Sequence, residues 1–156
     1  MQPRLDYSAA SPRAMKAMGT MDSFSTNCGL EASLLELIKT RASQINCCAY
    51  CVDMHTKDAR VRGETEQRLY GLSVWRETPY YTERERAALA LTEAVTLIAN
   101  KHVSDEIYDQ ARQHFNDEEL VNLMLNIVTI NAWNRFCITF QETAGTYEPR
   151  QAEAVK

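Results

Sequence analysis

Residues 36–55 read ELIKTRASQINCCAYCVDMH, and this stretch holds the pattern Cys48-x-x-Cys51-x-x-x-His55. On a helix, where each residue turns by about 100°, Cys51 lies about 60° from Cys48 and His55 lies about 20° from Cys48, so all three side chains share one face. Two thiols one turn apart can close a disulfide, and a neighbouring imidazole can exchange a proton with a thiol. The pattern is typical of a redox site that acts on a peroxide or on another disulfide.

The chemistry of such a pair assigns two different tasks to its thiols. A thiolate formed beside His55 is the nucleophile, and the second cysteine converts a sulfenic acid into a disulfide before further oxidation. We expect the cysteines on the opening turns of a helix that runs to about residues 62–63, where the helix N-terminus lowers the pKa of a thiol.

The helix before this cluster, from about residue 30 to residue 45, has apolar residues at helical spacing. Glu36 falls on the opposite side of that helix, so periodicity alone predicts a solvated surface carboxylate. The apolar stripe consists of Leu34, Leu35, Ile38, Ala42 and Ile45.

Composition limits the class of protein. The chain has 156 residues, of which 45% are hydrophobic, and this predicts a single domain over residues 1–156 with its core at about 30–142. The net charge of −4 comes from interspersed acids and bases, which argues against a nucleic-acid partner. No signal-peptide core and no run of about 18 apolar residues occurs, so we expect a cytoplasmic protein without a membrane partner.

Helix signals recur along the chain and no segment reads as a strand, which predicts an all-α fold. Capping boxes begin at Thr82 and Asn116, and the helix after Asn116 is apolar on nearly every side, interrupted by asparagines. We therefore expect that helix to be buried partly by a neighbouring subunit, and the polar tail after Gly145 to fray. The expected helices are 11–25 with an inner face of Met15, Met18, Met21 and Phe24, then 30–45, 48–63, 64–75, 82–98, 104–115 and 116–141.

The sequence also allows structural roles for the cysteines and histidines. Five cysteines, two of them adjacent, make a poor framework for structural disulfides, so most should be reduced thiols. Zinc held by Cys48, Cys51, His55 and an acidic residue is an alternative, but structural zinc sites usually pair two ligand clusters. Inert buried thiols are another alternative. The residues expected to pack or to be solvated are Cys28, Cys47, Cys137, His102 and His114.

The full pattern is Glu36, eleven residues, Cys48-Ala49-Tyr50-Cys51, three residues and His55, and it resembles the signature of the alkylhydroperoxidase D (AhpD) family. That family belongs to the carboxymuconolactone decarboxylase-like superfamily. The similarity extends through residues 75–79, 82–86 and 130–135 and covers about residues 30–142. The best-known members have His between the cysteines, where this chain has Tyr50.

The resemblance implies an AhpD-like helical bundle that assembles into trimers or hexamers and reduces organic hydroperoxides with no bound cofactor. It also implies an external reductant of the dihydrolipoyl dithiol type or a protein partner. It makes Cys51 peroxidatic, Cys48 the proton donor and resolving thiol, and Glu36 part of a proton relay with His55. Helix position alone favours the opposite assignment, because the cysteine nearer a helix N-terminus often has the lower pKa.

Two other functions remain open from the sequence. One is a thiol-disulfide oxidoreductase that acts on protein or small-molecule disulfides. The other is a non-enzymatic redox sensor whose disulfide reshapes an assembly, although the sequence offers no effector segment.

Overall fold

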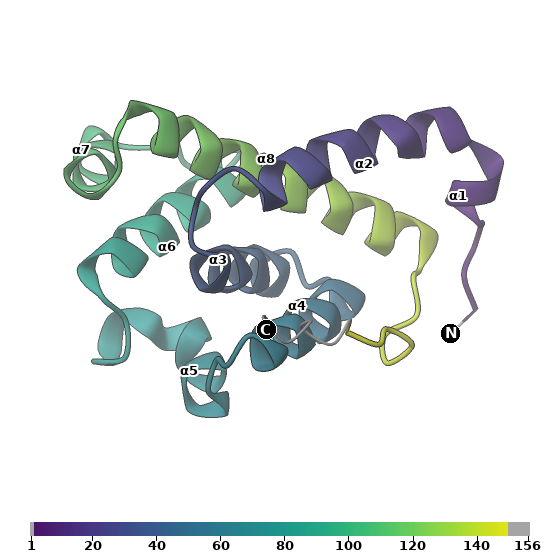
Figure 1. Cartoon of the computed structure of the whole chain (residues 1–156), viewed down its shortest axis with the longest axis horizontal. Helices are drawn as coiled ribbons and strands as arrows, with labels where there is room; N and C mark the ends of the chain where they lie inside the picture. The colour runs from purple at the N-terminus through teal and green to yellow at the C-terminus, as the bar shows by residue number, and fades with distance from the viewer. Residues whose placement is uncertain (1, 150–156) are drawn as a thin grey trace, which may run out of the picture.

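The computed structural model describes residues 2–149, and all regular structure in that range is helical (Figure 1). The all-α prediction is confirmed. The elements are α1 (Tyr7–Ala10), α2 (Pro12–Thr26), α3 (Ala32–Ile45), α4 (Ala49–Val61), α5 (Glu66–Gly71), the 3-10 helix η1 (Leu72–Glu77), α6 (Glu83–Thr96), α7 (Asp105–His114) and α8 (Asp117–Phe140).

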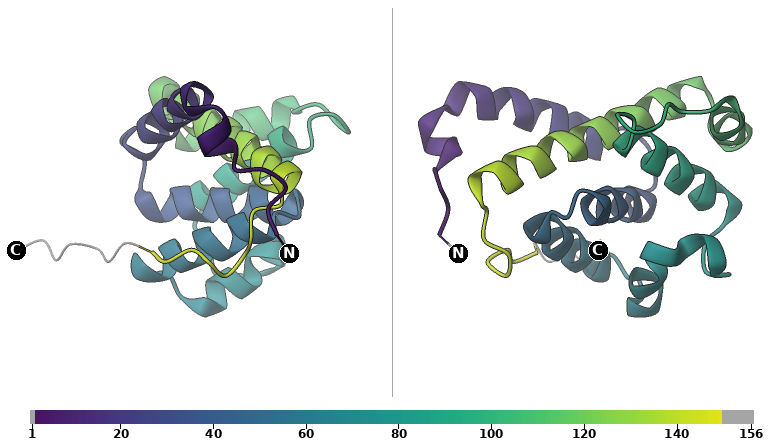
Figure 2. Two further views of the ribbon diagram at one scale, coloured as in Figure 1. Left: turned by 90° about the vertical axis from the view of Figure 1, so that its right-hand side faces the viewer. Right: turned by 180° about the vertical axis from the view of Figure 1, so that it is seen from behind.

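Helix α3 lies at the centre of the bundle and packs against α4, α6 and α8. Helices α2 and α8 cross over it on one side, and α6 and α7 close one end of the molecule (Figures 1 and 2). The main hydrophobic core forms where α3 meets α6, α7 and α8. Its largest fully buried members are Leu35, Ile38, Leu123 and Ile127.

Local sequence signals explain where two of the long helices begin. The Thr82 hydroxyl accepts a hydrogen bond from the backbone N–H of Glu85, and the Glu85 carboxylate accepts one from the Thr82 N–H. Asn116 and Glu119 make the same reciprocal pair at the start of α8. Both capping boxes satisfy helix N–H groups that would otherwise lack partners, so both predictions are confirmed.

The asparagines of α8 tie this helix to the turn between α3 and α4. Asn46, in that turn, donates to the side-chain oxygens of Asn131 at 2.9 Å and Asn134 at 2.8 Å. Asn134 in turn donates to the Ser43 hydroxyl at 3.0 Å, and it is completely buried. Residues that interrupt the apolar pattern of α8 thus fix the position of the segment that leads into Cys48.

Several expected details of the helices are wrong. Phe24 is 54% exposed instead of facing inward, because the last turn of α2 buries the neighbouring Ser25. The expected helix over 64–75 divides after Gly71 into α5 and the 3-10 helix η1, and Val74 within η1 has non-helical backbone angles. The helix expected to reach residue 98 ends at Thr96.

The first residues after Gly145 are held against the helical bundle, although the sequence predicted a frayed tail from this point. The backbone oxygen of Tyr147 accepts a hydrogen bond from Lys57 at 2.8 Å, and its hydroxyl donates to Asp58 at 2.8 Å. These contacts hold the tail against α4, and residues 150–156 lie outside the described range. Within residues 2–149 no helix combines the length and apolar character that a bilayer crossing needs.

Candidate redox site

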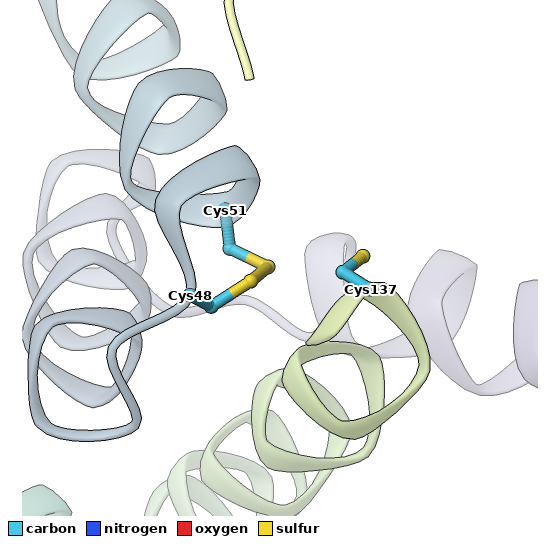
Figure 3. Close-up of side chains that lie close together, drawn as sticks. All are labelled: Cys48, Cys51 and Cys137. Carbon is cyan, nitrogen blue, oxygen red and sulfur yellow. A yellow bond between two sulfur atoms is a disulfide. The ribbon is translucent and has the colours of Figure 1, made fainter. Parts of the chain in front are cut away.

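The two cysteines of the motif are joined by a disulfide at the beginning of α4, with their Cα atoms 5.4 Å apart (Figure 3). Cys48 is the N-cap residue in an extended conformation, and Cys51 lies in the first turn. We expected both cysteines on one face of the helix. Cys51 is in the helix, but Cys48 precedes it as the N-cap residue, whose backbone is extended. Its carbonyl accepts the first helical bond, from the N–H of Val52.

The turn that delivers Cys48 to this position is tight. Cys47 has a φ of 56°, in the left-handed region that residues other than glycine seldom adopt. The chain then folds back, and the Cys48 N–H donates to the Ser43 carbonyl at 3.0 Å. The side chain of Cys47 is exposed, so the expectation that it packs in the interior is wrong.

Glu36 of α3 accepts a hydrogen bond from His55 of α4, with 2.9 Å between Oε2 and Nδ1. Both residues are buried, Glu36 at 5% exposure and His55 at 6%. The periodicity-based prediction that Glu36 is solvated is wrong. Helix α3 has no solvent side in this region, because α4, α6 and α8 surround it and residues 34–40 are all buried.

The electrostatic balance of this pair favours an ionised carboxylate. Burial raises the pKa of Glu36, but the hydrogen bond from His55 and the charges of His55, Lys39 and Arg62 outweigh burial and leave the pKa below its ordinary value. A carboxylate only accepts hydrogen bonds, so His55 donates from Nδ1 and its Nε2 can accept a proton when the ring is neutral. Nε2 is buried and has no hydrogen-bond partner in the described structure.

His55 and Cys51 line one cavity of about 290 Å³, which is enclosed by side chains from α1, α2, α3, α4 and α8. Trp133 and Ile130 supply apolar wall, while Lys39 supplies a charged group. Cys48 does not line this cavity. The structure therefore brings all four predicted site residues together, and it gives the thiol of Cys51, not that of Cys48, a place on the cavity wall.

A third thiol lies beside the disulfide. The sulfur atoms of Cys48, Cys51 and Cys137 are all within 4.8 Å of one another, and Cys137 comes from the neighbouring helix α8 (Figure 3). Burial raises the pKa of the Cys137 thiol to about 11, so it is protonated at neutral pH. The sequence supported only a packing role for Cys137, because nothing in its local spacing placed it near the motif.

The zinc alternative considered from the sequence does not match this geometry. Within residues 2–149 the three cysteines form one potential ligand group, whereas His55 belongs to another with Glu36 and Asp58. A set of Cys48, Cys51, His55 and a carboxylate is thus not assembled around a single point.

The other residues singled out in the sequence lie away from the cavity. His102 is exposed and His114 is half-buried in the last turn of α7, as expected for solvated or structural imidazoles. Cys28 packs against the main core and accepts a hydrogen bond from Asn126 at 3.3 Å. Besides the position of Cys137, sequence reasoning missed Lys39, although its place one helical turn after Glu36 puts both on the same face of α3.

Comparison with known proteins shows the family of this chain. The model of the carboxymuconolactone decarboxylase family matches residues 9–94. The uncharacterized protein YdfG of Bacillus subtilis is 44% identical over 146 residues, which is 94% of this chain and 99% of the relative. The chain belongs to the carboxymuconolactone decarboxylase family.

Solved structures of related proteins share the fold. A protein of unknown function from Agrobacterium tumefaciens, described as a putative antioxidant defence protein AhpD, is 44% identical with a TM-score of 0.90, covering 94% of this chain and 100% of that one. The debrominase Bmp8 in complex with 2,3,4-tribromopyrrole is 18% identical with a TM-score of 0.80, covering 88% and 74% of the two chains. The first of these confirms the AhpD-like character of this family member, and the second shares the fold alone.

Proposed function

We propose that this protein is a thiol-dependent peroxidase that reduces organic hydroperoxides through a Cys48–Cys51 redox cycle. The observation that carries the proposal is the placement of Cys51 and His55 on one small cavity, with Cys48 in disulfide contact behind Cys51. A redox role fits the disulfide, and the relative described as a putative antioxidant defence protein AhpD supports a role in antioxidant defence. The hydroperoxide substrate follows from the resemblance to the AhpD signature.

In the proposed first step, the Cys51 thiolate attacks the outer oxygen of the hydroperoxide. The O–O bond breaks, the sulfur becomes a sulfenic acid, and the alkoxide takes a proton and leaves as the alcohol. His55 can take the thiol proton at Nε2 and pass it on, because Glu36 holds the ring through Nδ1 and favours the imidazolium that forms. The first turn of α4 provides free backbone N–H groups that favour negative charge on Cys51.

In the second step, Cys48 attacks the sulfur of the Cys51 sulfenic acid, forming the disulfide and releasing water. A dithiol then reduces the disulfide and is itself oxidised to a cyclic disulfide, which returns both cysteines to thiols. Both cysteines are only 1% exposed, so the reductant must be narrow enough to enter the cavity. This burial favours a peroxidase with a small dithiol reductant over an oxidoreductase acting on protein disulfides.

The direct test is stopped-flow oxidation of the reduced protein by cumene hydroperoxide, compared with its oxidation by a small disulfide. We expect the hydroperoxide to react faster and to yield a Cys48–Cys51 disulfide on peptide mapping. Faster reaction with the disulfide would instead support the oxidoreductase. Pairing of Cys51 only with Cys28, Cys47 or Cys137 would contradict the cycle.

A further inference from the structure

Lys39 is a largely buried cation without a direct hydrogen-bond or ion-pair partner in the described structure. Its side chain is on the central helix α3, the residue is 6% exposed, and no hydrogen bond or ion pair joins its ammonium group to any residue of 2–149. Its ammonium nitrogen keeps some exposure although the residue is largely buried, and Lys39 lines a cavity, so this charge is available to a molecule that enters there. A lysine in this state marks a place where an anion can bind.

The lysine belongs to the redox cavity and is not enclosed elsewhere in the core. It lines the same cavity as Cys51 and His55, one helical turn along α3 from Glu36. Glu36 compensates part of this charge through space, but its carboxylate oxygens make their direct contacts with His55 at 2.9 Å and Arg62 at 3.6 Å, not with Lys39. Asp22 of α2 also lines the cavity but makes no ion pair with Lys39.

We propose that Lys39 binds the carboxylate of a small acidic substrate in this cavity and so orients its reactive end toward Cys51. This inference names the substrate class of the proposed peroxidase and rests on that function. The remaining wall suits such a molecule, since Trp133 and Ile130 would cover an apolar body between the acidic group and the reactive group. The carboxylate can be carried by the hydroperoxide or by the dithiol reductant.

A different role for the same charge would be to stabilise the Cys51 thiolate itself. The two roles differ in one measurable respect. A charge that acts on the thiolate changes the reaction of Cys51 with every electrophile by the same factor, whereas a charge that binds a carboxylate favours acidic reagents over neutral reagents of the same shape.

Iodoacetate and iodoacetamide form such a matched pair, because they differ only in carboxylate against amide. Reduced protein would be alkylated with each, and the rate at Cys51 would be followed by peptide mapping. In the wild-type protein we expect iodoacetate to be favoured relative to a model thiol, and in Lys39→Met the iodoacetate-to-iodoacetamide ratio should fall by about tenfold. Lys16→Met, which removes the same charge from an exposed position on α2, should leave the ratio unchanged.

An unchanged ratio in Lys39→Met would overturn the proposal, as would an equal fall in both rates. Because the substitution is in the core, a second measurement uses the wild-type protein alone. Benzoate should slow alkylation of Cys51 by iodoacetamide in a saturable manner, whereas benzamide at the same concentration should not. Equal effects of the two compounds would also refute the anion site.

The source of the carboxylate is tested by turnover. Cumene hydroperoxide is compared with its 4-carboxy derivative as oxidant, and dihydrolipoamide with dihydrolipoate as reductant. A preference for the acid that disappears in Lys39→Met identifies which reactant Lys39 holds, and no preference in either comparison contradicts the proposal. The alkylation assay needs no peroxidase activity, so failure of every hydroperoxide to react would refute the proposed function and leave the anion site to be judged by alkylation.

Discussion

Helices α3 and α8 depart from the usual amphipathic pattern in opposite ways. Helix α3 buries charged residues, since Glu36 and Lys39 are 5% and 6% exposed, whereas α8 exposes apolar ones, including Val121 at 67% and Val128 at 41%. In α3 both residues lie at the candidate redox site, Lys39 on the cavity wall and Glu36 hydrogen-bonded to His55. In α8 the exposed residues lie away from the cavity, on a face suited to contact with another chain. The first departure coincides with the candidate redox site, and the second predicts self-association.

The largest effect expected on the chemical side is at the cysteines. Cys51→Ser should abolish hydroperoxide consumption, because serine is not oxidised by the substrate. Cys48→Ser should permit one reaction and leave a sulfenic acid at Cys51, which drifts toward sulfinic acid without a resolving thiol. Dimedone labelling with mass spectrometry measures this difference. Sulfenic acid at Cys48 in Cys51→Ser, with none at Cys51 in Cys48→Ser, would reverse the roles.

Substitutions in the hydrogen-bonded pair of Glu36 and His55 should produce the next largest effect. His55→Ala and Glu36→Gln should each slow the first oxidation step by up to about 10²–10⁴-fold if the pair transfers protons. Single-turnover rates with cumene hydroperoxide check this, with circular dichroism to verify the fold. Glu66→Gln, on the exposed surface of α5, is the matched control and should retain the wild-type rate. A wild-type rate in Glu36→Gln would show that Glu36 has a structural role and takes no part in proton transfer.

The lowered pKa of Glu36 also predicts a pH dependence of stability. A carboxyl whose pKa is lower in the folded state than its ordinary 4.5 stabilises the fold above that value, and this stabilisation disappears as pH falls through the folded-state pKa. Wild type and Glu36→Gln should therefore differ most near neutral pH and converge in acid. Urea unfolding midpoints across this range measure the difference. A difference in unfolding midpoint between the two proteins that grows as pH falls would contradict the ionised state of Glu36.

The exposed face of α8 predicts self-association. Val121→Lys with Val128→Lys should shift the protein to a smaller species in light scattering, because lysines would be buried in the expected subunit contact. Tyr70→Lys is the matched control, since Tyr70 is 71% exposed on α5, far along the chain from α8. A wild-type monomer at micromolar concentration would refute the expected oligomer. In that case α8 would be an ordinary surface helix.

The smallest effect concerns the turn between α3 and α4, which is tied to α8 through Asn46. Cys47→Gly should stabilise the protein by about 1 kcal/mol, because glycine adopts positive φ without the steric cost that a Cβ imposes. Gly63→Ala should have the opposite sign, since Gly63 has a φ of 94° and no atom near its missing Cβ that could compensate. Thermal unfolding of both variants provides the comparison. A destabilised Cys47→Gly would mean that the cysteine side chain supports the turn.

The sequence by itself determined the elements that depend on neighbours along the chain. The capping boxes at Thr82 and Asn116, the all-helical fold and the spacing of Cys48, Cys51 and His55 follow from interactions across three or four residues. The same spacing is the basis of the resemblance to the AhpD signature, and that resemblance predicted a proton relay between Glu36 and His55.

Only the tertiary structure decided which side chains of α3 lose contact with water. Periodicity assigned Glu36 to solvent because it assumes one buried face, and α3 is enclosed by helices whose sequences lie up to about a hundred residues away. The same enclosure places Lys39 on the cavity wall and brings Cys137 within 4.8 Å of the redox pair. These relations depend on how segments distant in sequence pack together. The residue pattern of one helix does not specify which other helices cover that helix.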